Sequence, residues 1–150
     1  MREIKFRGKV FNIWVYGHYL PWHSVKDENG KDVYAQIFVD DGRHSKQNIV
    51  GAHTVGQYTG LKDKNGKEIY EGDILLLPAN TKVEAYKKGD FVDDRFVKRF
   101  AIVWAKQCQG YGLCLPYEAE FAAPDVVGTA AVDRMFVIGN IHDNPELLNK

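Results

Sequence analysis

The sequence lacks a net charge that would attract an oppositely charged partner. Its 150 residues contain twenty lysines and arginines and twenty aspartates and glutamates, so the formal net charge at pH 7 is zero. Proteins that bind nucleic acid commonly carry a basic excess, which neutralises phosphates and releases counterions. The balance removes the global signal for a nucleic-acid partner and leaves only a local basic patch as a route to one.

Cysteines and long apolar runs are also scarce. The two cysteines, Cys108 and Cys114, flank a Gly-Tyr-Gly turn and are close enough in sequence to meet across a hairpin. However, the first residues (MREIK) contain no apolar core of signal-peptide length, and no segment is apolar over the length of a membrane span. We therefore expect free thiols in the cytoplasm rather than a disulfide, and no membrane partner.

Recognisable catalytic and metal-binding motifs are missing. The sequence contains no glycine-rich phosphate loop, no serine nucleophile elbow and no cysteine–histidine signature. Residues 63–66 (DKNG) resemble the start of a calcium loop but lack the Gly and Glu that an EF-hand needs at its sixth and twelfth positions. Paired aspartates at 40–41 and 93–94 leave a magnesium site as the weaker alternative to solvated loop tips. We therefore expect no enzyme activity, no cofactor and no metal.

Turn signals between alternating apolar and polar segments are abundant. Asn-Gly pairs occur at 29–30 and 65–66, and such pairs favour tight hairpins because both central residues of a type I′ turn take positive φ. The central stretch 55–77 has the pattern strand, turn, strand, turn, strand. The residues of this stretch that we expect in the core are Ile69 or Tyr70, together with Ile74.

The two ends of the chain carry further secondary-structure signals. Residues 4–7 alternate as a half-buried strand that Gly8 is expected to end, and residues 13–20 form an aromatic-rich strand that Pro21 is expected to stop. Together they predict an N-terminal hairpin. Near the other end, residues 144–145 (Asn-Pro) are typical of a helix cap and first turn, and they predict a short C-terminal helix.

The first strand combines basic residues with nearby aromatics. Lys5, Arg7 and Lys9 alternate and would lie on one face of that strand. Basic strands beside exposed aromatic rings hold single-stranded nucleic acid by charge and base stacking. The same pattern also fits a strand whose polar face is solvated while its neighbouring aromatics fill the core. The candidate binding residues are Lys5, Arg7, Lys9, Trp14, Tyr16 and Trp22.

Several segments together resemble the YopX family of phage and prophage proteins. The segments are residues 5–9 (KFRGK), 14–17 (WVYG), 55–74 (with GQYTGLKDKNGKEIYEGDI) and 137–148 (with IGNIHDNPELL). The resemblance covers both ends and the middle of the chain, whereas residues 44–54 and 78–131 lack its landmarks. It implies a small phage-encoded or prophage-encoded protein with SH3-like barrel character in a bacterial host cell, and it implies no catalytic residues.

Residues and resemblance together define the expected protein. We expect one domain over 1–150 that is mainly β, an SH3-like barrel with an N-terminal β-hairpin layer and a short C-terminal helix. A finer division would pack an N-terminal lobe, 1–54, on a barrel, 55–150. The expected function is a non-catalytic, cytoplasmic accessory protein that assembles with itself and binds an unidentified phage or host protein. The alternative is a weak nucleic-acid-binding module that uses the basic and aromatic strand face.

Overall fold

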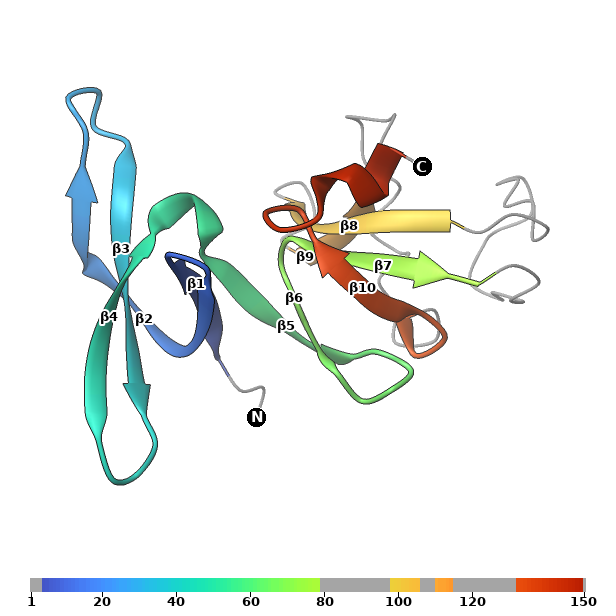
Figure 1. The fold of residues 1–150 in the computed structure, drawn as a ribbon, viewed down its shortest axis with the longest axis horizontal. Helices are drawn as coiled ribbons and strands as arrows, with labels where there is room; N and C mark the ends of the chain where they lie inside the picture. Colours follow the sequence, from blue (N-terminus) through green and yellow to red (C-terminus); the bar gives the residue numbers. More distant parts are fainter. Residues whose placement is uncertain (1–3, 79–97, 106–109, 115–131, 150) are drawn as a thin grey trace. The chain divides into compact units, whose positions relative to one another are not determined.

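The structure is a computed structural model that describes residues 4–78, 98–105, 110–114 and 132–149. The chain divides into two compact units, Met1–Gly60 and Leu61–Lys150. The described residues are mainly β-strand and include no helix of seven or more residues, which confirms the predicted class (Figure 1). Cys108 and the aspartate pair 93–94 lie outside the described residues. The predicted packing of an N-terminal lobe, 1–54, on a barrel, 55–150, stays a prediction.

No helix in the described ranges has the length and apolar character needed to cross a membrane.

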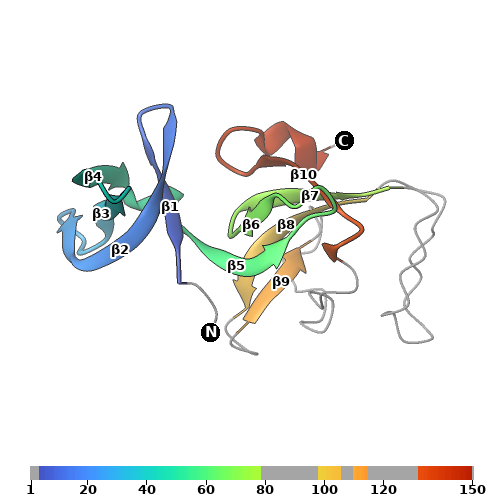
Figure 2. The same ribbon diagram turned by 90° about the horizontal axis from the view of Figure 1, so that it is seen from below.

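The first unit is an antiparallel sheet whose strands follow one another along the chain. Within it the hydrogen-bonded neighbours have the order β4-β3-β2-β1-β5. Figure 2 shows β2 as a long, curved strand between β1 and β3. The last strand returns to the first, because Phe6 pairs with Gln57 and Arg7 with Gly56. The elements are β1 (Phe6–Val10), β2 (Ile13–Lys26), β3 (Asp32–Asp40), β4 (Ser45–Gly51), the 3₁₀ helix η1 (Ala52–Thr54) and β5 (Gly56–Lys62).

The predicted N-terminal hairpin is confirmed, but Gly8 does not end its first strand. Val10 pairs with Ile13 across a two-residue loop, and β1 continues through Gly8 to reach it. A Cβ at Gly8 would lie 2.8 Å from the Cγ2 atom of Val50, a core residue. Glycine at this position therefore lets β1 pass close over the core instead of terminating the strand.

Pro21 likewise does not stop the second strand. β2 extends to Lys26, and its register with β3 shifts between Leu20 and Val25. Proline has no N–H to donate to a sheet and is tolerated where regular pairing is interrupted. The irregularity thus accommodates Pro21 within a single long strand.

Two features hold the curved sheet together. On the inner face, Ala35, Ile37 and Val50 are buried and form the centre of an apolar cluster. At the sheet's edge, the Lys9 N–H donates to the Thr54 hydroxyl at 2.8 Å, and that hydroxyl donates to the Gly51 carbonyl at 2.7 Å. η1 therefore ties the end of β4 to β1. Other residues packed on the cluster are Phe6, Val10, Val15, Tyr19, Val39, Ala52 and Val55.

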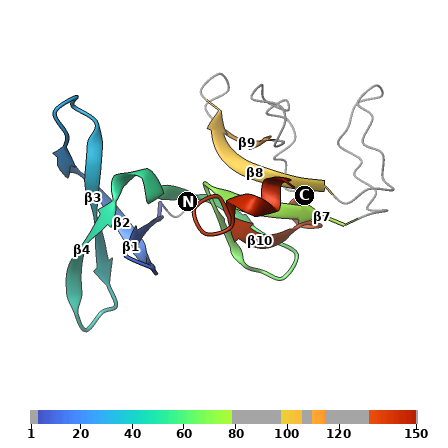
Figure 3. The same ribbon diagram turned by 45° about the horizontal axis from the view of Figure 1, so that its top comes forward.

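The second unit contains a four-stranded antiparallel sheet with the order β10-β7-β8-β9. Figure 3 shows β7 with β8 and β10 as its neighbours. Its core includes Ile69 and Leu75, and Tyr70 and Ile74 are also buried, as the sequence predicts. The elements are β6 (Glu68–Tyr70), β7 (Asp73–Leu77), β8 (Lys98–Ala105), β9 (Gly110–Cys114), β10 (Phe136–Asn140) and the 3₁₀ helix η3 (Pro145–Asn149).

Two predicted features of this architecture differ in the structure. The described residues form no closed barrel, so the SH3-like barrel is not confirmed. The predicted C-terminal helix is wrong in type, because η3 is a 3₁₀ helix of five residues. Its first hydrogen bond runs from the Leu147 N–H to the Asn144 carbonyl at 3.0 Å, a spacing of three residues. An Asn-Pro start fits either helix type, so the sequence signal does not separate them.

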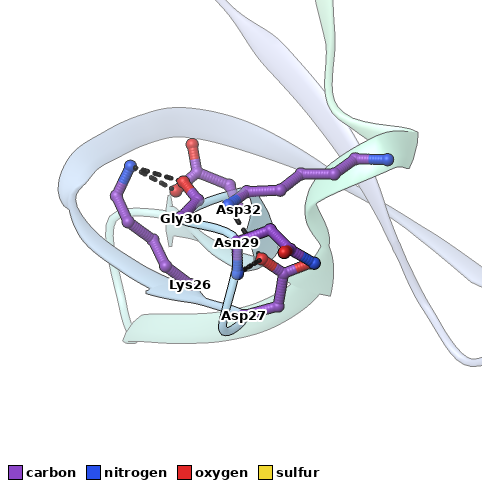
Figure 4. Close-up of polar contacts among 6 residues, drawn as sticks. Lys26, Asp27, Asn29, Gly30 and Asp32 are labelled. Carbon is purple, nitrogen blue, oxygen red and sulfur yellow. Dashed lines mark hydrogen bonds and ion pairs between the residues drawn. The ribbon is translucent and has the colours of Figure 1, made fainter.

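Both Asn-Gly turns are present and are built alike, from residues 27–31 (DENGK) and 63–67 (DKNGK) (Figure 4 shows the first). In each loop one aspartate Oδ1 accepts two backbone N–H groups, from the residues two and four positions later. Only the glycines have positive φ, 77° at Gly30 and 80° at Gly66. The predicted type I′ geometry is therefore wrong. The loops have three residues between the paired Asp and Lys and need positive φ at one position only.

One of these aspartates does more than shape its own turn. Asp63 is 6% exposed, and its second oxygen, Oδ2, accepts the Val137 N–H at 3.0 Å, so it joins the loop to β10. Asp27, in the matching loop, is exposed. Two similar loop sequences thus serve as a surface turn in one unit and as a buried connection in the other.

Substitution of these two aspartates should separate the roles. Asp63→Ala should lower the free energy of unfolding by about 3 kcal/mol, because three N–H groups lose an acceptor in a buried setting. Asp27→Ala should cost about 1 kcal/mol, because water replaces the lost bonds. Urea titration followed by circular dichroism measures both. Equal losses would contradict the buried role of Asp63.

A second prediction concerns the close approach of the paired strands β2 and β3 at Gly17. A Cβ on Gly17 would lie only 2.1 Å from the Phe38 carbonyl oxygen, so the backbone itself would have to move. Gly17→Ala should therefore lower the free energy of unfolding by about 3 kcal/mol. The adjacent exposed residue supplies the control, and His18→Ala should cost less than about 0.5 kcal/mol in the same urea titration. A Gly17→Ala protein as stable as the control would contradict the close approach.

Candidate binding surfaces

The predicted basic and aromatic residues of the N-terminal hairpin lie together. In the register of β1 and β2, Arg7 is opposite Tyr16 and Lys9 is opposite Trp14. The Arg7 Cζ atom lies 4.6 Å from the centroid of the Trp14 ring, and the Lys9 Nζ atom lies 5.8 Å from it. Both distances suit cation–π attraction, so two cations of β1 hold the Trp14 ring in place.

This arrangement changes which cations a ligand can reach. Arg7 is 6% exposed, so it contributes to packing rather than to an exposed basic face. Lys5 precedes β1, and its carbonyl accepts the Tyr58 N–H at 2.8 Å. Tyr16 is exposed, whereas the side chain of Trp22 lies outside the described residues. The structure therefore brings Arg7, Lys9, Trp14 and Tyr16 together and leaves fewer reachable charges than the alternation predicts.

A hollow of about 420 Å³ opens beside Trp14 in the first unit. One wall comes from the start of β2 and the other from the end of β3, the following loop and β4. Its lining surface is mainly apolar, with charged groups of both signs among the lining residues. Sequence patterns did not predict it, because its two walls are 23 to 34 positions apart in sequence and form the hollow only when β2 and the β3–β4 hairpin come together. The lining residues are Trp14, Val15, Tyr16, Val39, Asp41, His44, Lys46 and Asn48.

Asp41 organises the loop at one wall of this hollow. Its Oδ1 atom accepts the His44 N–H at 2.7 Å and the Arg43 N–H at 2.9 Å. These two backbone hydrogen bonds, the one from His44 first, lower the pKa of the Asp41 carboxyl group below its usual value. The His44 Nδ1 atom also lies 3.9 Å from the Asp41 Oδ2 atom. The acidic pair at 40–41 thus includes a turn-forming carboxylate with one oxygen bound to backbone N–H groups of the loop and the other near the His44 side chain.

The loop that joins β1 to β2 presents an unusual apolar tip, which we call the β1–β2 tip (Val10–Ile13). Phe11 has φ of 53° and is the one non-glycine residue with positive φ in the described ranges. Its side chain is 95% exposed, and Ile13 is 70% exposed. A bulky residue with positive φ is strained, and a two-residue hairpin turn usually places glycine there. Turn signals in the sequence therefore did not point to this tip, because Phe-Asn is not one of the residue pairs that favour a two-residue hairpin turn.

A third apolar surface lies on the outer face of β2, β3 and β4. Val25 pairs with Tyr34, and Ile49 of β4 pairs with Gln36, two residues along β3 on the same face. Val25, Tyr34 and Ile49 are all exposed. Cross-strand and diagonal neighbours on one face lie within reach of each other. These three side chains therefore form one patch, which we call the outer patch.

The acidic loops that the structure describes show no arrangement for a metal ion. In the described part of the chain, no group of three or more His, Cys, Asp or Glu side chains is placed to hold one. The loop in Figure 4 uses the protein's own cation instead: the Lys26 Nζ atom lies 3.4 Å from the Asp32 Oδ1 atom. A hydrogen bond from Ser24, and then the Lys26 ammonium group, lower the pKa of Asp32. These contacts stabilise a turn.

The distinctive C-terminal motif has a structural role of the same kind. The Asn140 Oδ1 atom accepts the N–H groups of His142 and Asp143, and its Nδ2 group donates to Asp143 Oδ2 at 2.8 Å. A Cβ at Gly139 would lie 2.6 Å from the Asn144 Oδ1 atom. The polar residues of this motif therefore shape the turn between β10 and η3.

Comparisons with known proteins give a family and a fold. The family model described as YopX protein matches residues 5–149. The crystal structure of protein EF1440 from Enterococcus faecalis is similar with a TM-score of 0.50 and 23% sequence identity, over 99% of each chain. At that identity the likeness bears on the fold alone. A comparison with curated proteins gives no match. Because the family model takes in nearly the whole length, the chain belongs to the YopX family.

Proposed function

We propose that this protein is a non-catalytic, intracellular accessory protein of a phage or prophage that binds proteins and assembles with copies of itself. One observation carries the proposal. Of the nine large apolar side chains exposed in the described residues, eight belong to the first unit. Extended exposed apolar surface on a soluble protein marks an interaction site. The eight are Ile4, Phe11, Ile13, Tyr16, Val25, Val33, Tyr34 and Ile49.

Architecture supports this role. The first unit has five antiparallel strands in sequence order, a 3₁₀ helix before the fifth strand, and pairing of that strand with the first. SH3-like barrels share this order, and we propose on this ground that the SH3-like element of the chain is residues 1–60 instead of the predicted 55–150. Small barrels of this class commonly present apolar surfaces and loops to protein partners. The second unit then supplies a separate sheet whose motif residues stabilise turns.

Charge and sheet edges favour self-assembly. The formal net charge of zero removes the long-range repulsion that keeps many small proteins apart. β4 ends the strand order of the first unit, so one of its edges has no strand partner among the described residues. Open edges can pair with a second chain. Association between copies of the chain is therefore favoured by its exposed apolar side chains, by the edge of β4 and by its charge neutrality.

Light scattering coupled to size-exclusion chromatography tests this proposal. At tens of micromolar, the protein should elute with a mass above the 17.1 kDa of one chain. Since apolar burial would drive the contact, raising the salt concentration should not dissociate it. A mass of one chain at every concentration would contradict self-assembly, and dissociation by salt would indicate an electrostatic contact instead.

A nucleic-acid partner remains the second candidate, because Arg7, Lys9 and Trp14 do lie together on the N-terminal hairpin. Because Arg7 is buried, Lys5 and Lys9 are the two of the three predicted basic residues that remain to contact phosphates. Two phosphate contacts would give a salt slope of about −1.4 on single strands, which is a weak electrostatic contribution. Useful affinity would then depend on base stacking, worth about 1–3 kcal/mol per base.

Fluorescence anisotropy with labelled single-stranded and duplex DNA measures this candidate. We expect binding weaker than tens of micromolar at physiological salt, because the neutral chain supplies no wider basic field. Lys9→Glu is the informative variant, and Lys31→Glu, in the exposed DENGK loop, is the charge-matched control. Submicromolar binding that Lys9→Glu abolishes, with folding and the control unaffected, would place nucleic acid first.

A further inference from the structure

The β1–β2 tip holds a strained aromatic side chain in solvent. Phe11 has φ of 53° and its ring is 95% exposed, so packing within the chain does little to offset its strain. The tip is nonetheless well held, because Val10 and Ile13 pair directly on either side of the two-residue loop. Because the backbone on either side of the loop is already ordered, binding of this ring costs mainly the rotamer entropy of one side chain. The tip therefore has the properties of an anchor for a partner.

The hollow beside Trp14 has the properties of a receiving site. It is an open hollow of about 420 Å³ on the surface of the first unit, so a side chain from another chain can reach it. Trp14 and Tyr16 line it, and Arg7 and Lys9 hold the Trp14 ring in position. Aromatic rings attract a further ring in offset or edge-to-face geometry. A phenylalanine side chain thus matches both the apolar lining and the chemistry of the wall.

The positions of tip and hollow suit a two-fold contact between identical chains. Phe11 lies in the two-residue turn of the hairpin, and Trp14 is the second residue of β2 after that turn, so the tip and the hollow are neighbours on one hairpin. In an isologous dimer each chain presents the same surface, so a tip next to a hollow allows both insertions at once. The lining residues Asp41 and Lys46 carry opposite charges, so two copies do not face each other with one sign.

We propose that two copies of this chain associate by inserting Phe11 of each into the hollow of the other. This inference rests on the self-assembly proposed above and assigns its contact. Each phenylalanine ring buries about 200 Å², and with Ile13 and the surfaces they cover the total is on the order of 1,000 Å². That area is near the lower limit of specific interfaces, so the contact is large enough for a specific but small dimer interface.

Two variants remove the two halves of the contact. Phe11→Gly deletes the ring and accepts positive φ, so it leaves the hairpin at least as well folded. Lys46→Trp places a large side chain at the exposed wall of the hollow and fills it. Val25→Ser, at the far end of β2 in the outer patch, is the matched control that removes exposed apolar surface elsewhere. Circular dichroism verifies that each variant is folded.

Sedimentation equilibrium then gives the dimer dissociation constant of each protein. Phe11→Gly and Lys46→Trp should each raise it about tenfold or more, as loss of an interface anchor does, whereas Val25→Ser should change it less than about twofold. In an equimolar mixture, the intact tip of Lys46→Trp can enter the intact hollow of Phe11→Gly. The mixture should therefore associate more tightly than either variant alone.

The outcomes separate this inference from the function on which it rests. If the unchanged protein dimerises and Phe11→Gly dimerises equally well, the interface lies elsewhere, and the tip-in-hollow contact is wrong while self-assembly stands. The same holds if the mixture associates no better than its components. If the unchanged protein is monomeric throughout, both the self-assembly and the contact are wrong.

Discussion

The close approach of β2 to β3 at Gly17 is the constraint on which the first unit depends. With no Cβ at this position, the Phe38 carbonyl oxygen can lie where a side chain would otherwise stand. Gly8 allows a second close approach, of β1 to the core residue Val50. These two glycines let a single meander curve enough for its last strand to return to its first. The curvature also brings the start of β2 beside the β3–β4 hairpin, and this is what creates the hollow.

The segments that identify the family and the surfaces that carry the proposed function lie in different places. The long central motif and the C-terminal motif supply turn residues such as Asp63 and Asn140, whose side chains are occupied by backbone N–H groups. The β1–β2 tip and the outer patch consist of apolar side chains in the first unit. The motif residues in this protein therefore stabilise its turns, whereas the surfaces of the proposed function are identified by exposure and shape.

Much of the strand pattern could be predicted because its signals are local. Alternation and Asn-Gly pairs located the strands and turns around residues 27–31 and 63–67, since turn-forming hydrogen bonds reach only a few residues along the chain. Burial of Ile69 and Ile74 followed from the same alternation. Gly8 and Pro21 were expected to end strands because local rules treat them as breaks. Both lie inside strands. Gly8 has no side chain to obstruct the close contact with Val50, and Pro21, which has no N–H to donate, lies where the register of β2 and β3 shifts.

The sequence by itself determined the mainly β class, the positions of the turns and the family, because these depend on residue type and short-range spacing. It also singled out Arg7, Lys9, Trp14 and Tyr16 as a group, since alternation on two paired strands places them on neighbouring positions. Only the tertiary structure decided that Arg7 is buried, that Phe11 is exposed, and that Trp14 borders a hollow with residues of β3 and β4. Exposure and cavity shape arise from contacts between segments distant in sequence, and these contacts exist only once the sheet has curved.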